Sequence, residues 1–117
     1  MTSAKVKRRK DSRALLEGFW PQAFRFSKPQ PLKVGIMADI MADIEKRGLP
    51  FTTEMVKSAM ALYTNQIDYY KALAKGMQRI DLDGNPAGEP TEEERTRARK
   101  LMRKAFVKTA RGAAEAK

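Results

Sequence analysis

Apolar residues along most of this chain recur at spacings of three and four, in runs that proline, glycine or turn sequences interrupt. The clearest run contains Ile36, Ile40 and Ile44, and it stops where Gly48 and Pro50 follow. Such a repeat places apolar side chains on one face of an α-helix, and glycine followed by proline is typical of a helix end. The pattern therefore predicts a mostly helical fold built from short amphipathic helices.

The chain of 117 residues is long enough for one compact core and too short for two. We expect a single domain of about five helices, over residues 12–20, 32–47, 53–63, 66–75 and 91–108. Residues 24–31 contain two prolines and are predicted to form an extended connection, and the third helix is expected to start after Thr52 or Thr53. A capping box of Thr91 and Glu94 is predicted to begin the last helix, whose apolar stripe from Ala98 to Phe106 is expected to pack on the domain. A small β-hairpin is predicted near residues 78–89, because Ile80 and Leu82 alternate with charged residues before the turn sequence Asp83-Gly84-Asn85-Pro86. The aspartates there lack the ligand spacing of an EF-hand, so we interpret them as turn residues.

Positive charge is concentrated at the two ends of the chain. Residues 1–13 and residues 92–117 each carry a net charge of +5, whereas residues 14–91 carry nine basic and nine acidic side chains. This distribution favours a polyanionic partner, above all nucleic acid. We expect residues 1–11 to form a flexible basic arm, residues 12–108 to form the domain, and residues 109–117 to fray.

The chain contains neither cysteine nor histidine. Disulfides and zinc fingers are therefore excluded, and the commonest general base near neutral pH is missing. Neither of the two best-known glycine-rich phosphate loops is present. The residues alone still allow an enzyme, but its chemistry would have to use carboxylates, lysine or tyrosine. The sequence also lacks the apolar run of ~20 residues that a bilayer span needs and a signal-peptide pattern, so the cytoplasm is the expected location.

Tyr69 is the most informative aromatic residue of the predicted helix 66–75. An apolar stripe that begins at Ile67 places Tyr69 roughly 200° around the helix, facing solvent. A tyrosine face is a surface on which an RNA base packs, and the backbone amides at the helix start, at Thr64, Asn65 and Gln66, attract phosphate. The residues alone leave two interpretations open: a pocket for a terminal nucleotide, or a plain helix cap beside a surface tyrosine.

Four stretches of the sequence resemble the ProQ/FinO family of bacterial RNA-binding proteins, in the family's order and at its spacing, over about residues 12–106. The combination of P-L-K-x-G-I with a later R-x-D-L-D-G-N-P is highly specific. The stretches are Pro31-Leu32-Lys33-Val34-Gly35-Ile36 with Asp39-Ile40, Ser58-Ala59-Met60 through Leu62-Tyr63-Thr64, Tyr69 with Lys71-Ala72-Leu73, and Arg79-Ile80-Asp81-Leu82-Asp83-Gly84-Asn85-Pro86 with Gly88-Glu89.

The resemblance implies a compact, mostly helical domain with a small β-hairpin that binds structured RNA, namely a hairpin followed by a single-stranded 3′ tail, such as an intrinsic terminator. It implies an RNA chaperone in post-transcriptional regulation, with small RNAs and mRNA 3′ ends as partners. We therefore predict a non-enzymatic RNA-binding protein without cofactor or metal, and we expect neither a membrane nor an obligate protein partner. The family's RNA-contacting residues fall on Lys33, Lys57, Tyr69 and Arg79. Because Arg79 alternates with Ile80 in the predicted hairpin, we expect its side chain to face water.

The sequence departs from the family pattern at several positions. Thr53, Ala61 and Asp68 stand where some relatives carry basic side chains, and Pro90 replaces an aliphatic residue. Two rival hypotheses rest on the residues alone. Helices 53–63 and 66–75 are compatible with a helix-turn-helix that binds DNA, and the basic helix 91–108 is compatible with docking on a partner protein or a membrane surface.

Overall fold

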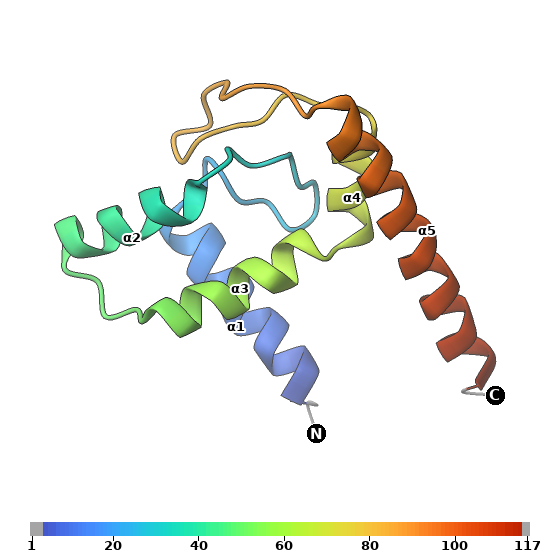
Figure 1. Cartoon of the computed structure of the whole chain (residues 1–117). Coiled ribbons are helices and arrows are strands. Elements are labelled where there is room, and N and C mark those ends of the chain that lie inside the picture. Colours follow the sequence, from blue (N-terminus) through green and yellow to red (C-terminus); the bar gives the residue numbers. More distant parts are fainter. Residues whose placement is uncertain (1–3, 116–117) are drawn as a thin grey trace.

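The computed structural model describes residues 4–115, and five α-helices make up most of this part of the chain (Figure 1). The predicted fold class, mostly helical, is confirmed. The helices are α1 (Ala4–Phe19), α2 (Ile36–Arg47), α3 (Thr53–Thr64), α4 (Ile67–Ala74) and α5 (Glu92–Glu115).

The core lies where α1, α3 and the connection between α1 and α2 meet. Tyr63 of α3 is completely buried. The rings of Phe24 and Phe26 pack edge-on against it, with centroids 5.0 and 4.9 Å away. The Tyr63 hydroxyl accepts a hydrogen bond from the backbone N–H of Arg25 (3.2 Å), and burial raises the pKa of Tyr63 to about 12. The connection predicted as extended chain is thus fixed by aromatic packing on α3.

Local sequence explains where α2 and α3 begin and end. Gly35 and Gly48 flank α2 with φ angles of 85° and 63°, a left-handed conformation that favours glycine. Thr52 caps α3, and its side chain accepts a hydrogen bond from the amide of Met55. The predicted helix 32–47 therefore begins four residues later than expected, because the left-handed Gly35 cannot continue a helix through Leu32.

Two helices extend further than the sequence indicated. α1 begins at Ala4 rather than near residue 12, so residues 4–11 of the expected flexible arm are helical. α5 continues to Glu115, past the expected end near residue 108. Residues 1–3 and 116–117 of the predicted ends lie outside the described residues. Residues 4–11 are rich in lysine and arginine, and residues 109–115 contain three alanines. These residue types propagate a helix well when no proline intervenes.

The β-hairpin predicted near residues 78–89 is wrong, since no strand forms in residues 4–115. Ile80 makes only isolated bridges, parallel to Leu32 and antiparallel to Pro86. The Asp81 carboxylate accepts hydrogen bonds from the amides of Asp83 and Asn85, both at 2.9 Å. The turn chemistry is therefore present as predicted, but the proline at position 86 has no amide to extend a ladder.

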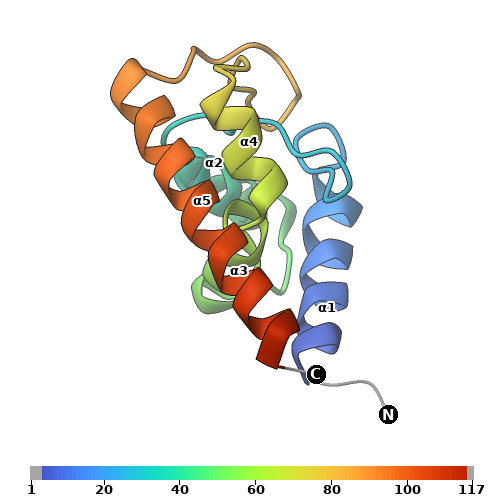
Figure 2. The same ribbon diagram turned by 90° about the vertical axis from the view of Figure 1, so that its right-hand side faces the viewer.

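Helix α5 is attached to the body through α4 at its amino-terminal half (Figure 2). The predicted capping box is present: Thr91 Oγ1 accepts from the Glu94 amide (3.1 Å), and Glu94 Oε1 accepts from the Thr91 amide (2.9 Å). Ala98 is buried, whereas Phe106, which we expected to pack on the domain, is 56% exposed. The far end of α5 therefore projects beyond the body, on the same side as the start of α1 (Figures 1 and 2).

No helix in the described residues combines the length and the apolar character needed to cross a bilayer.

Candidate nucleic-acid interface

A buried polar junction joins four segments of the chain around Leu32. Tyr69, on α4, is only 6% exposed, and its hydroxyl accepts a hydrogen bond from the Leu32 amide (3.1 Å). Its ring packs on that of Tyr63, with centroids 5.8 Å apart. Burial raises the pKa of Tyr69. The phenol therefore remains protonated near neutral pH and acts as a structural hydrogen-bonding group.

The prediction that Tyr69 faces solvent is wrong. The buried side of α4 carries Tyr69 and Ala72, while Tyr70 is half-exposed and donates its hydroxyl to the Asn65 side chain (2.8 Å). A stripe at positions 69, 72 and 73 has the same helical spacing as the stripe that we chose. Spacing alone did not distinguish them, because the partner of the Tyr69 hydroxyl lies 37 residues away in sequence.

Arg79 completes the junction, and the prediction that it faces water is also wrong. Arg79 is buried, with only 8% of its surface exposed. One guanidinium nitrogen donates to the Leu32 carbonyl (2.6 Å), and another forms an ion pair with Glu94 at the start of α5 (2.7 Å). The expectation assumed the alternation of a β-strand, and no strand is present there. Arg79 therefore holds together the Leu32 segment and α5.

The backbone amides that we expected to attract a phosphate at the start of α4 are already hydrogen-bonded within the protein. The amides of Asn65 and Gln66 donate to the carbonyls of Ala61 and Tyr63 and thereby end α3. The Thr64 hydroxyl donates to the Met60 carbonyl (3.0 Å), and the Gln66 side-chain amide donates to the Tyr63 carbonyl (3.1 Å). Because the break between α3 and α4 is so short, Thr64, Asn65 and Gln66 all donate hydrogen bonds to carbonyls of α3.

The remaining predicted residues are cations on the surface. Lys33 follows Leu32 directly and pairs with Asp39 of α2 (2.7 Å), and this hydrogen bond raises the pKa of the lysine. Lys57 is exposed on α3, and no ion pair or hydrogen bond links its side chain to another described residue. The fold therefore brings Lys33, Tyr69 and Arg79 together around Leu32, whereas Lys57 stands apart on another helix.

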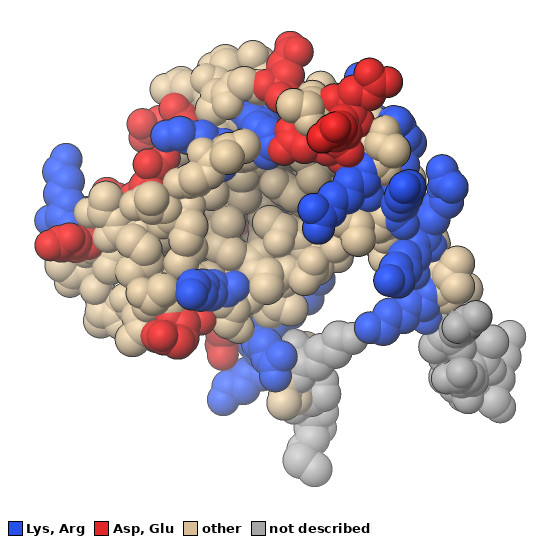
Figure 3. Space-filling model, in the orientation of Figure 1, with Lys and Arg blue, Asp and Glu red and all other residues tan. Residues whose placement is uncertain are grey.

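Exposed basic side chains gather on α1 and α5. Figure 3 shows them along α5 and toward the start of α1, with acidic side chains grouped where α5 begins. A polyanion is attracted to such a side by its summed field. The exposed cations are Lys7, Arg8, Arg9, Lys10 and Arg13 in α1 and Arg97, Lys100, Arg103, Lys104 and Lys108 in α5.

Three lysines that the sequence analysis left unassigned surround a hollow beside α4. Lys28, Lys71 and Lys75 line this hollow, which has a volume of about 280 Å³. The spacing of four residues between Lys71 and Lys75 was the available signal, because it places both side chains on one side of a helix. Lys28 carried no such signal, since it lies in the connection between α1 and α2.

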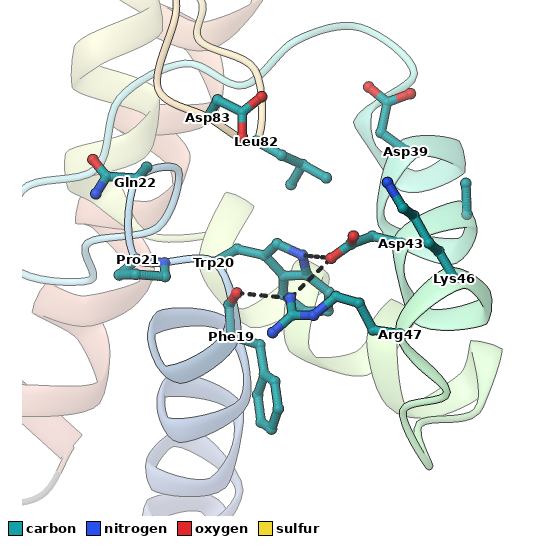
Figure 4. Close-up of a pocket in the computed structure, with 11 residues that line it drawn as sticks. Phe19, Trp20, Pro21, Gln22, Asp39, Asp43, Lys46, Arg47, Leu82 and Asp83 are labelled. Atoms are coloured by element: carbon teal, nitrogen blue, oxygen red, sulfur yellow. Dashed lines mark hydrogen bonds and ion pairs between the residues drawn. The ribbon is translucent and has the colours of Figure 1, made fainter.

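A larger hollow of about 560 Å³ lies on the side of α2, between that helix, the end of α1 and residues 82–83 (Figure 4). Trp20 donates its indole N–H to Asp43 (2.8 Å), and Arg47 pairs with the same carboxylate (2.9 Å). These hydrogen bonds lower the pKa of Asp43. Asp39 and Asp83 also line this hollow, together with Lys46. Its three carboxylates outnumber its two cations, so the hollow offers a polyanion no net positive charge. Among the described residues, no cluster of three or more acidic side chains is placed to hold a metal ion.

The sequence and the fold of this chain are similar to those of known proteins. A family model described as the ProQ/FINO family matches residues 6–115. The crystal structure of a FinO-like RNA chaperone from Neisseria meningitidis is 22% identical and superposes with a TM-score of 0.64, covering 97% of this chain and 99% of that one. The NMR structure of a ProQ homologue from Legionella pneumophila is 24% identical, with a TM-score of 0.67, covering 91% of this chain and 88% of that one.

Proposed function

Because the chain belongs to the ProQ/FinO family, whose model matches residues 6–115, we propose that it binds RNA and acts as an RNA chaperone, without catalysing a reaction. The observation that carries the proposal is the gathering of exposed lysines and arginines on α1 and α5. Neutralised phosphates release counterions, and this release supplies sequence-independent affinity for nucleic acid. The similar structure from Neisseria meningitidis, described as a FinO-like RNA chaperone, supports the same function.

The preferred RNA ligand is a hairpin followed by a single-stranded 3′ end, as in an intrinsic terminator. Two cationic helices suit a duplex, since duplex RNA is recognised mostly through its shape and its phosphates. Lys33 and Lys57 contact phosphates directly in this proposal, Lys33 by exchanging Asp39 for the RNA. Tyr69 and Arg79 act as positioning residues, because both are buried and hold the segment that carries Lys33.

In the cell, the protein acts in the cytoplasm on small RNAs and on mRNA 3′ ends, in post-transcriptional regulation. This part of the proposal rests on the resemblance of its sequence motifs to the family. Crosslinking followed by sequencing of the bound RNA tests it. Reads are expected to accumulate at transcript 3′ ends, and an even distribution along transcripts would contradict the proposed preference.

A competition experiment tests the biochemical proposal. The full chain is bound to a labelled RNA hairpin with a uridine-rich 3′ tail at ~0.15 M salt, and unlabelled competitors are added. The tailed hairpin should compete best, a blunt hairpin of the same stem less well, and a DNA duplex of the same sequence least. Equal competition by the DNA duplex would refute RNA recognition and favour a helix-turn-helix mode of binding.

A further inference from the structure

The hollow beside α4 has a cationic rim that takes no part in the buried junction or in the basic surfaces of α1 and α5. Lys28 lines it from the connection between α1 and α2, whereas Lys71 of α4 and Lys75, which caps the end of α4, line it from the helix. All three side chains belong to exposed residues, and none forms an ion pair with a described residue. Like charges four residues apart destabilise a helix, so an anion between Lys71 and Lys75 relieves a repulsion.

The anion that fits this rim must tolerate an acidic neighbour. Asp68 also lines the hollow and lies three residues before Lys71. Three lysines against one aspartate leave the hollow with net positive charge. Lysine ammonium groups are flexible point charges, which suits phosphates that are spaced along a strand more than one rigid, bidentate anion.

The floor of the hollow is apolar. Pro29 and Ala72 are buried, and Met77 is half-buried beside them. Apolar and thioether surface gives a free inorganic anion nothing to contact, whereas a ribose or base packs on it. The volume of about 280 Å³ is close to the lower end, ~300 Å³, of small-molecule sites, so the hollow has room for one nucleotide and not for a duplex.

Basic side chains of α1 and α5 contact residues that are next in sequence to the lining of the hollow. Arg9 of α1 donates to the Gln66 side chain (3.1 Å) and lies over the Phe26 ring, with its guanidinium carbon 5.8 Å from the ring centroid. Phe26 directly precedes Ser27, which lines the hollow. On the other side, Arg99 of α5 reaches the Ala74 carbonyl near the end of α4 (3.5 Å). Figure 2 shows α4 lying between α5 and the chain that follows α1.

We propose that this hollow binds one nucleotide of a single-stranded RNA segment next to the hairpin, with Lys28, Lys71 and Lys75 contacting its flanking phosphates and the apolar floor contacting its ribose or base. The inference rests on the proposed function, because it assigns a place to the single-stranded part of the same RNA. A duplex keeps its bases stacked inside, whereas a single strand offers ribose, base and phosphate together.

The test replaces Lys71 and Lys75 together by glutamine and uses a matched control. The control, Lys100→Gln with Lys104→Gln, removes two exposed lysines four residues apart on α5. Affinities are measured for a hairpin with a single-stranded tail and for the same hairpin with a blunt end. Losing two single-strand phosphate contacts should weaken binding of the tailed RNA about tenfold at 0.15 M salt and reduce the slope of log affinity against log salt by ~1.4. Binding of the blunt hairpin should hardly change.

The other outcomes distinguish this inference from the proposed function. Equal losses for tailed and blunt RNA, as expected from the α5 control, would overturn the hollow as a single-strand site while leaving RNA binding intact. If the unaltered chain binds neither RNA, the proposed function itself fails. Reduced binding to phosphatidylserine vesicles without any effect on RNA would also overturn the inference, in favour of a membrane surface.

A second variant tests whether a folding defect of α4 explains the loss of binding. Lys28→Gln lies outside α4 and should reproduce part of the tail-specific loss, about threefold for one contact. Unchanged circular dichroism and melting temperature in all variants confirm that the exposed lysines are not structural. A tail-specific loss in the α4 variant together with normal tail binding by Lys28→Gln would remove Lys28 from the proposed site.

Discussion

Replacing Arg79 by alanine should destabilise the whole domain, and the size of the effect follows from its two partners. The hydrogen bond to the Leu32 carbonyl is buried and charge-assisted, and leaving such an acceptor unpaired costs ~1–3 kcal/mol. The ion pair with Glu94 contributes less, ~0–1 kcal/mol, because the carboxylate side chain is 40% exposed and screened by solvent. We expect a total loss of ~1–4 kcal/mol in the free energy of unfolding.

Urea and thermal unfolding followed by circular dichroism measure this loss. For a domain of this size, ~4 °C of melting temperature corresponds to 1 kcal/mol, so Arg79→Ala should melt roughly 4–16 °C lower. Lys57→Ala is the matched control, since it also removes one cation but from an exposed position, and it should change stability by less than ~0.5 kcal/mol. If Arg79→Ala melts within the range of the control, the junction does not hold the fold.

A double-mutant cycle separates the two partners of Arg79. Glu94→Ala alone removes the ion pair together with the capping box of α5, whereas Glu94→Gln retains an oxygen acceptor for the cap. The coupling between Arg79→Ala and Glu94→Gln should be at most ~1 kcal/mol. A larger coupling would mean that the ion pair, rather than the Leu32 carbonyl, dominates the stability of the junction.

Three further predictions concern single groups. Tyr69→Phe keeps the ring but leaves a buried amide unpaired and should cost ~1–3 kcal/mol in urea unfolding, whereas Tyr70→Phe, whose hydroxyl serves an exposed side chain, should cost less than half as much. Gly48→Ala places a side chain at φ 63° and should cost ~1–2 kcal/mol, while Gly18→Ala, within α1 and with open space around it, should stabilise by up to ~1 kcal/mol. The hydrogen bond from the Thr91 amide is the chief cause of the lowered pKa of Glu94. The carboxylate therefore stabilises the fold fully above its ordinary pKa of ~4.3, and this stabilisation is lost as the pH falls through the lowered pKa. Glu94→Gln should reduce the fall of the urea midpoint at acidic pH, and an unchanged fall would contradict this assignment.

The elements that the sequence predicted well are those with local causes. The stripe of α2 ends at Gly48, Thr52 caps α3, and the capping box of Thr91 and Glu94 begins α5. Each of these signals lies within four residues of the boundary that it marks. The start of α1 was missed because residues 4–11 lack an apolar stripe, although lysine and arginine are good helix formers.

The candidate site was harder to predict because its decisive contacts join distant segments. Tyr69 meets Leu32 across 37 residues, and Arg79 meets it across 47. Both side chains are polar, and a polar side chain is expected outside unless a partner satisfies it. The partners here are backbone groups of an irregular segment, which no periodicity reveals. The resemblance of sequence motifs pointed to Tyr69 and Arg79 but did not indicate that both side chains are buried.

The junction also determines where the cations of α5 point. Arg79 and Glu94 fix the first turn of α5 to the Leu32 segment, and Ala98 packs one turn later, so the basic remainder of the helix projects from a point set by a buried guanidinium. A polyanion is steered toward the exposed cations of α1, α4 and α5 rather than into the larger hollow, where Asp39, Asp43 and Asp83 outnumber the two lining cations. A variant at Arg79 can therefore weaken RNA binding without any contact between Arg79 and RNA. Such an indirect effect should lower affinity for tailed and blunt hairpins alike, whereas loss of Lys71 and Lys75 should affect the tail alone.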